Sequence, residues 1–200
     1  MSETPANSYC MGAISEPLLS LQTHTVTVVD ETTTYSCAAF KTEDEDLKDA
    51  QLRKTSLLIE EARIDSKHEI LEIGCGWGSL AIEVVKRTGC KYTGITISEE
   101  QLKYAEMRVK EAGLQENIRF QLYDYRQLPS TYKYDRIISC EMIEAVGHEY
   151  MEDFFGCCES VLAKDGLFVL QSGACGEHRT SLLPNAQILE REFLVEHLEV

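Results

Sequence analysis

A glycine-rich segment, Glu72-Ile73-Gly74-Cys75-Gly76-Trp77-Gly78, constrains the fold of this chain more than any other feature. It follows the short β-rich run 69–73 and opens the stretch 79–88, whose apolar side chains recur at helical spacing. Glycine has no Cβ atom, so it permits unusual backbone angles and lets a ligand approach the main chain closely. A glycine triplet by itself is equally typical of a plain tight turn. Its position between a strand and a helix favours a ligand-binding turn.

Strand-like and helix-like segments alternate along most of the chain. A charged helix is expected over 44–63, and further strands and helices are expected at 91–97, 98–112, 118–122, 134–139, 150–163 and 167–171. Ser98 and Gln101 form a capping-box pattern at the start of one helix, and Gly113 suits its end. This alternation predicts an α/β, Rossmann-like fold with a doubly wound, mostly parallel sheet.

The composition narrows the classes of partner. The 200 residues carry a formal net charge of -15, which repels phosphate backbones and argues against nucleic acid. The eight cysteines show no Cys-x-x-Cys pairing, so we expect buried thiols, not a metal site. No apolar run approaches the roughly 20 residues that span a bilayer, and no secretory signal is visible. We therefore expect a cytoplasmic protein that makes at most peripheral contact with a membrane.

The spacing of the glycines and the end of the second strand bear on the cofactor. A dinucleotide site has the pattern G-x-G-x-x-G and an acidic residue at the end of the second strand. Here the glycines are spaced Gly-x-Gly-x-Gly, and the second strand ends near Thr96. Glu72 precedes the turn, where a carboxylate can orient the turn or meet a cationic amino group. These features favour S-adenosylmethionine, which carries an amino group and no pyrophosphate, over NAD.

Four spaced motifs resemble the cyclopropane-fatty-acyl-phospholipid synthase family, and most closely its plant members. They are Thr34-Tyr35-Ser36-Cys37-Ala38, the 72–78 turn, Thr96-Ile97-Ser98-Glu99-Glu100-Gln101, and Ile143-Glu144-Ala145-Val146-Gly147-His148. The resemblance is nearly continuous from residue 35 to residue 171, and it implies that the Rossmann-like fold is of the class I methyltransferase type. It implies transfer of a methyl group from S-adenosylmethionine to the cis double bond of a phospholipid acyl chain, followed by proton loss and ring closure.

The resemblance and the turn together give a set of candidate site residues. The candidate cofactor contacts are Tyr35, Ser36, Glu72, Gly74, Cys75, Gly76, Thr96, Ile97, Ser98, Gln101, Tyr125 and Arg126. The resemblance also implies a bound bicarbonate that accepts the proton, near the catalytic candidates Cys37, Glu144 and Gln171. Bacterial members often have histidine where this chain has Gln171, and an amide still offers a hydrogen bond. Without the resemblance, Glu144 is interpreted as a solvated loop acid, and Cys37 fits a buried thiol and a functional thiol equally well.

Both ends of the chain depart from the family pattern. Residues 1–28 lack its His-Tyr-Asp helix and read as a poorly ordered segment, 29–171 as the cofactor-binding core, and 172–200 as a divergent tail. We expect this tail to form a terminal helix around Ile188, Leu189, Phe193 and Leu194, with the last strands of the sheet missing. The fifth strand would then be an exposed edge that promotes self-association. We expect cofactor binding to survive in part and lipid turnover to be weak or absent.

Three functions stay open at this point. The first is a methyltransferase that acts on unsaturated phospholipid, shortened at both ends. The second is a small-amine N-methyltransferase, because plant benzylisoquinoline enzymes share this domain and a similar glycine turn. The third is a non-catalytic remnant that binds the cofactor or a partner protein.

Overall fold

The structure is a computed structural model that describes residues 34, 36, 38–42 and 44–172, together with the strand backbones of 187–190 and 194–199. Its elements, in chain order, are α2 (Leu47–Glu61), β1 (Glu69–Ile73), α3 (Ser79–Thr88), β2 (Lys91–Thr96), α4 (Glu99–Glu111), β3 (Ile118–Leu122), η1 (Tyr125–Gln127), β4 (Tyr134–Cys140), η2 (Ile143–Ala145), η3 (His148–Tyr150), α5 (Met151–Val161), β5 (Leu162–Ser172), β6 (Gln187–Glu190) and β7 (Leu194–Glu199). The expectations for 1–28, Tyr35 and Cys37 lie outside the described residues.

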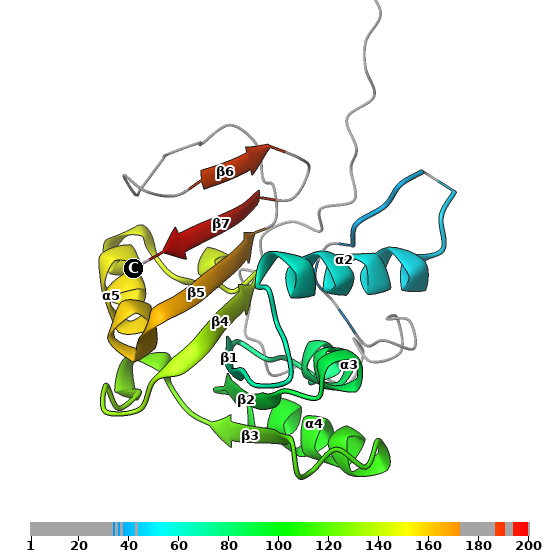
Figure 1. Cartoon of the computed structure of the whole chain (residues 1–200), viewed down its shortest axis with the longest axis horizontal. Coiled ribbons are helices and arrows are strands. Elements are labelled where there is room, and N and C mark those ends of the chain that lie inside the picture. The colour runs from blue at the N-terminus through cyan, green and yellow to red at the C-terminus, as the bar shows by residue number, and fades with distance from the viewer. Residues whose placement is uncertain are drawn as a thin grey trace, which may run out of the picture.

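The strands form one sheet in the order β3-β2-β1-β4-β5-β7-β6 (Figure 1). The first five strands in this order run parallel, and β7 pairs antiparallel with both β5 and β6. The strand order reverses beside β1, because β2 lies on one side of it and β4 on the other. In such sheets ligands bind outside the carboxyl ends of the strands at this reversal.

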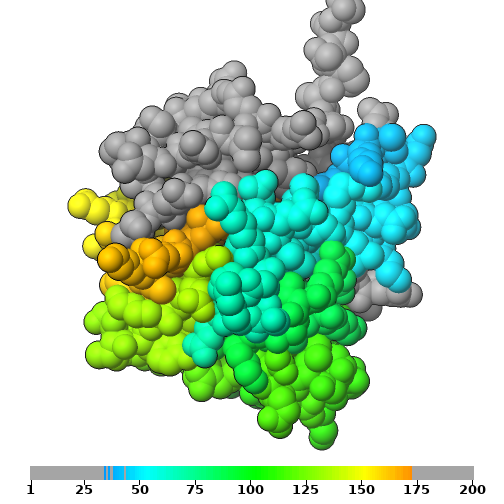
Figure 2. Space-filling model, viewed as in Figure 1, coloured from blue at the N-terminus to red at the C-terminus, as the bar shows by residue number. Residues whose placement is uncertain are grey.

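Helices cover both faces of the sheet, as a doubly wound fold requires. On one face, apolar residues of α2, α3 and α4 such as Leu58, Val84 and Val109 pack against Ile70 and Ile138. On the other face, Phe154, Cys158 and Val161 of α5 pack against alternate residues of the same strands. The atoms of helix α2 adjoin the rest of the coloured body in Figure 2, and α2 contacts α3 and buries Ala50, Lys54 and Leu58. The fold class expected from the sequence is therefore confirmed.

The ends of helix α4 follow the sequence prediction closely. Ser98 is the N-cap, and its hydroxyl accepts a hydrogen bond from the Gln101 backbone N–H at 3.3 Å. The reciprocal half of the capping box does not form, because the Gln101 side chain contacts the Thr96 hydroxyl at 2.7 Å. Gly113 follows the helix with φ +69°, the left-handed conformation that favours glycine at this position.

The tail differs from its prediction. Residues 187–190 and 194–199 are strands, so the expected terminal helix is wrong, and the sheet does continue beyond β5. Strand β7 pairs with β5 from Leu167 to Ser172, so β5 is not an exposed edge. The physical reason is that a strand edge presents unpaired N–H and C=O groups, and pairing them outweighs weak helical periodicity. Among the described residues no helix is long and apolar enough to cross a membrane.

Candidate functional site

The glycine turn lies at the carboxyl end of β1, in the middle of the parallel strands. Gly74, Gly76 and Gly78 have φ angles of +85°, +50° and +80°, in the left-handed region that side chains disfavour. The backbone N–H groups of Gly74 and Cys75 both donate to the Ile95 carbonyl, at 3.1 and 3.0 Å. These bonds tie the turn to the end of β2, so its shape is fixed by both strands.

Close packing leaves no room for a side chain at two of these glycines. A Cβ atom on Gly74 would lie 2.9 Å from Met142 Cγ, and one on Gly78 would lie 2.8 Å from Phe120 Cζ. Gly94, on β2, is a third such position that the sequence analysis missed, because a Cβ there would lie 2.6 Å from the Phe120 ring. A glycine inside a strand is the signal that could have found it.

Cys75 points its side chain inward, not toward solvent. Its thiol is buried, and a Cβ atom added to Gly94 would lie 2.8 Å from the Cβ atom of Cys75. Burial raises the pKa of this thiol well above its usual range. Any contribution of Cys75 to cofactor binding is therefore expected from its backbone.

Glu72 is a buried acid directly before the turn, with 3% of its surface exposed. Burial raises the pKa of its carboxyl to about 8, and the Tyr92 hydroxyl and the Lys54 ammonium oppose that rise. Its Oε2 atom is buried without a hydrogen-bond partner. A buried polar atom without a partner is costly, so its presence beside a ligand-binding turn suggests that a ligand satisfies it.

Helix α2 holds the Ser36 segment through two buried polar side chains that the sequence analysis missed. Gln51 Nε2 donates to the Ser36 carbonyl at 2.8 Å, and Lys54 Nζ donates to the Ser36 hydroxyl. Gln51 and Lys54 are 3% and 4% exposed, which is rare for these residue types. Their i, i+3 spacing on the face that also carries Leu58 is the signal that could have found them.

The end of β2 combines a buried hydroxyl with an exposed apolar side chain. Thr96 is buried, and its hydroxyl contacts the Gln101 side chain and accepts from the Ser98 N–H at 3.1 Å. The neighbouring Ile97 is 82% exposed. An apolar side chain left uncovered beside the turn suits a flat, apolar ligand group.

Tyr125 and Arg126, which follow β3 in η1, point in different directions. The Tyr125 ring packs edge-on against Phe154 at 5.2 Å, so it belongs to the α5 face of the core. Arg126 is exposed and pairs with Asp124, whose pKa it lowers through a side-chain hydrogen bond. The segment still lies at the carboxyl edge of the sheet, because the Tyr123 N–H donates to the Thr96 carbonyl at 2.9 Å.

Past the end of β4, the structure brings Gln171 together with a residue that the sequence analysis missed. Gln171 is 1% exposed, and its Nε2 donates to Glu141 Oε1 at 2.9 Å. Glu144 lies three residues further on, exposed, in η2. Glu141 is half-buried and has a φ of +46°. Its unusual backbone angle could not be read from the sequence, because no glycine marks it.

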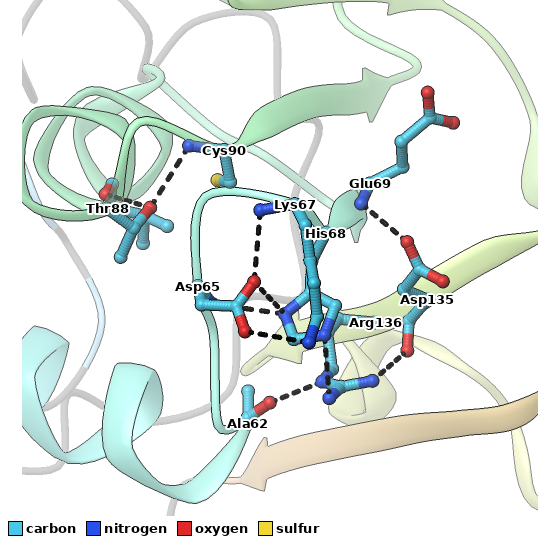
Figure 3. A network of polar contacts seen from close by, with 10 residues as sticks. Ala62, Asp65, Lys67, His68, Glu69, Thr88, Cys90, Asp135 and Arg136 are labelled. Atoms are coloured by element: carbon cyan, nitrogen blue, oxygen red, sulfur yellow. Dashed lines mark hydrogen bonds and ion pairs between the residues drawn. The ribbon is translucent and has the colours of Figure 1, made fainter.

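A second polar network lies at the opposite, amino end of the strands. His68 Nε2 lies 3.1 Å from Arg136 Nη2, and Arg136 Nε donates to the Ala62 carbonyl at the end of α2 (Figure 3). Asp135 accepts from the Glu69 N–H at 2.8 Å. A shallow depression of about 340 Å³ lies at this amino end of the strands. A second depression, of about 300 Å³, lies between α4 and β3. These contacts join α2 to β1 and β4, and we interpret them as structural.

Comparison with known proteins identifies relatives of the whole described core. The family model described as mycolic acid cyclopropane synthetase matches residues 23–197. A probable fatty acid methyltransferase of Pseudomonas putida is 36% identical over 154 residues, which cover 75% of this chain and 38% of that protein. The matched range ends at residue 197 and so extends into the segment from residue 172 that we interpret as a divergent tail.

Solved structures agree with the sequence relatives. The cyclopropane synthase MmaA2 from Mycobacterium tuberculosis superimposes with a TM-score of 0.67 at 31% identity, over 72% of this chain and 50% of that one. Coclaurine N-methyltransferase bound to N-methylheliamine and SAH gives a TM-score of 0.66 at 28% identity, over 70% and 41%. This chain thus spans half or less of the length of these proteins. It belongs to the mycolic acid cyclopropane synthetase family and has the S-adenosylmethionine-dependent methyltransferase fold.

Proposed function

We propose that this chain binds S-adenosylmethionine and transfers a methyl or methylene group from it to the cis double bond of an unsaturated phospholipid acyl chain. The observation that carries this proposal is the glycine turn above the buried Glu72, whose Oε2 has no partner. The names of the relatives support the reaction class, since one is named a probable fatty acid methyltransferase and another a cyclopropane synthase.

The described residues fit the cofactor. The amino group of its methionine part is a cation that suits the Glu72 carboxylate, and the turn allows close approach of the main chain. Ile97 offers an uncovered apolar surface to the adenine ring, and Thr96 and Gln101 form a fixed polar pair beside it. When bound, the cofactor supplies a methyl group on a cationic sulfur.

The protein residues would contribute position and shielding more than acid strength. An alkene is a weak nucleophile, so the rate depends on holding it against the methyl group and on excluding water from the cation that forms. Gln51 and Lys54 hold Ser36, which the family resemblance implies as a cofactor contact. We propose Tyr35 and Cys37 as further site residues on the same resemblance.

The first test is binding of S-adenosylhomocysteine to the full chain by isothermal titration calorimetry. Ile97→Ser should weaken binding about tenfold or more, since burying such a side chain is worth about 1.5–3 kcal/mol. Met107→Ser is the matched control, because Met107 is also exposed but lies on α4 outside the site. Absence of measurable binding to the unaltered chain would contradict the proposal and favour the remnant hypothesis.

The second test is mass spectrometry of vesicles of dioleoyl phosphatidylcholine incubated with the chain and S-adenosylmethionine. Acyl chains that gain one CH₂ unit support lipid methylene transfer. Small-amine N-methylation is the second candidate, because the Glu141 and Glu144 carboxylates near the end of β4 would attract an ammonium group and one structural relative is an N-methyltransferase. Methylation of benzylisoquinoline amines with unchanged lipid would favour that candidate.

A further inference from the structure

Glu141 has a strained backbone at the functional end of the sheet. Two non-glycine residues in the described ranges have positive φ angles, Arg63 and Glu141. Arg63 directly follows the C-cap of α2, where the left-handed conformation commonly ends a helix. Glu141 directly follows β4, where no helix ends. Strain of this kind persists where surrounding contacts hold it, and it concentrates at functional sites.

Gln171 makes two contacts that help to hold Glu141 in this conformation. The Glu141 N–H donates to the Gln171 carbonyl at 2.7 Å, and Gln171 Nε2 donates to Glu141 Oε1 at 2.9 Å. Gln171 is itself buried, and its Oε1 atom is buried without a hydrogen-bond partner. The buried Gln171 amide therefore fixes the position of the Glu141 carboxylate.

The same segment lies against the glycine turn. Met142 directly follows Glu141, and a Cβ on Gly74 would lie 2.9 Å from Met142 Cγ. In the sheet, Cys140 pairs with Gln171 and Ile138 pairs with Glu72. Since alternate residues of a strand share a face, Glu72, Cys140 and Gln171 lie on the face that α2 covers. The Glu141 carboxylate is thus next to the proposed cofactor site.

The charges around this point do not favour the bicarbonate that the family resemblance implies. Burial raises the pKa of the Cys140 thiol to about 12, the Lys54 ammonium opposes this, and the carboxylates of Glu72, Glu141 and Glu144 add to it. Among the described residues, the groups that act on this thiol are thus three carboxyl groups and one ammonium, and Glu72 is mostly protonated before the cofactor binds, so Glu141 and Glu144 supply the negative charge. A second anion beside Glu141 would be repelled, whereas a cation would be stabilised. One N–H of Gln171 that would hold the anion is already donated to Glu141.

We propose that the Glu141 carboxylate, held by Gln171, is the proton acceptor of the reaction and takes the place of a bound bicarbonate. This inference rests on the proposed lipid methylene transfer. When the methyl–sulfur bond breaks and the methyl group bonds to one alkene carbon, S-adenosylhomocysteine is left and the other alkene carbon is cationic. A C–H bond of that methyl group then breaks, its electron pair forms the C–C bond to the cationic carbon, and the ring closes. The proton passes to a carboxylate oxygen of Glu141 and from there to water.

The test compares the full-length chain with two variants and a control. Glu141→Gln keeps the size and an oxygen that accepts from Gln171 but cannot take a proton. Glu141→Gly removes the carboxylate and suits the positive φ, which offsets the hydrogen bond lost from Gln171, so the variant should still fold. Arg63→Gly is the matched control, because it relieves similar strain away from the site. All four proteins should bind S-adenosylhomocysteine with similar affinity.

The kinetic arm measures CH₂ transfer to dioleoyl phosphatidylcholine vesicles, in CO₂-free buffer and with added bicarbonate. The unaltered chain and Arg63→Gly should be active without bicarbonate, and Glu141→Gln should lose about a hundredfold or more of kcat. Bicarbonate should restore part of the activity of Glu141→Gly, because it can enter the space of the missing carboxylate. Bicarbonate dependence of the unaltered chain, or full activity of Glu141→Gln, would overturn the inference.

A binding arm decides the question even if no lipid is converted. The linewidth of [¹³C]bicarbonate should not change with the unaltered chain but should broaden saturably with Glu141→Gly. Saturable binding to the unaltered chain would refute the inference. If only the proposed function fails, the lipid stays unchanged, while bicarbonate still broadens with Glu141→Gly and not with the unaltered chain.

Discussion

Gly78 and Gly89 offer a matched pair for testing how the glycine turn depends on missing side chains. Both have left-handed backbones, with φ angles of +80° and +72°, and they flank α3 at its two ends. A Cβ on Gly78 would lie 2.8 Å from Phe120 Cζ and 2.9 Å from Ala105 Cβ, whereas a Cβ on Gly89 would meet nothing within 4 Å. The two substitutions to alanine therefore share backbone strain and differ in steric overlap.

The expected costs follow from these two contributions. Alanine in the left-handed region costs about 1–2 kcal/mol, so Gly89→Ala should lower the free energy of unfolding by about that amount. Overpacking adds about 1–3 kcal/mol, so Gly78→Ala should cost about 2–5 kcal/mol in total. Urea unfolding followed by circular dichroism measures both values.

A third variant identifies the source of the difference. Phe120→Leu shortens the side chain that the new Cβ atom would meet, so the double variant Gly78→Ala/Phe120→Leu should be more stable than the sum of the two single effects. S-adenosylhomocysteine affinity should fall with Gly78→Ala and stay unchanged with Gly89→Ala, which lies at the far end of the helix. Equal losses of stability for the two alanine variants would refute the packing argument.

Three further predictions concern ionisable groups. The Glu72 carboxyl, with its pKa near 8, should hold about 0.9 proton at pH 7 and release it when the cofactor amino group binds. Titrations of S-adenosylhomocysteine in buffers of different ionisation enthalpy should show this release, and Glu72→Gln should abolish it. Lys54→Met should weaken the same binding about tenfold by freeing Ser36, whereas Lys48→Met, on the exposed side of α2, should not. Burial, and next the charge of Arg136, lower the pKa of His68. Because the unfolded chain then binds more protons, stability should fall as pH drops below about 6.5, and His68→Gln should flatten that dependence in thermal melts.

The core from residue 69 to residue 172 could be predicted because its local patterns agree with its tertiary environment. The helix expected at 79–88 forms with those bounds, and Ser98 caps the next helix. Such agreement is expected where apolar periodicity and cap residues are strong. The terminal helix failed for the opposite reason, since the edge of β5 supplies pairing partners that lie outside the local sequence.

The site was predicted less completely, because burial of polar groups is a tertiary property. The glycine turn and Thr96 were found from residue type and position. Gln51 and Lys54 read as ordinary solvated positions of a charged helix, yet both are buried beneath the Ser36 segment. Nothing in the sequence marks the positive φ of Glu141. Residue patterns show which groups can bind a ligand, but only the fold shows which of them lack solvent.

The excess of carboxyl groups at the end of β4 bears on both the proposed cofactor binding and the proposed proton transfer. The sulfonium methyl donor and the carbon that becomes cationic are both positively charged, and Glu72 and Glu141 present carboxyl groups to the same edge of the sheet. A site that is negative before the reaction favours the charge that develops during it, without any rearrangement of its groups. Neutralising Glu72 should then weaken cofactor binding more than turnover, and neutralising Glu141 should do the reverse. If both variants changed KM and kcat in the same proportion, the division of roles between the two carboxyl groups would be wrong.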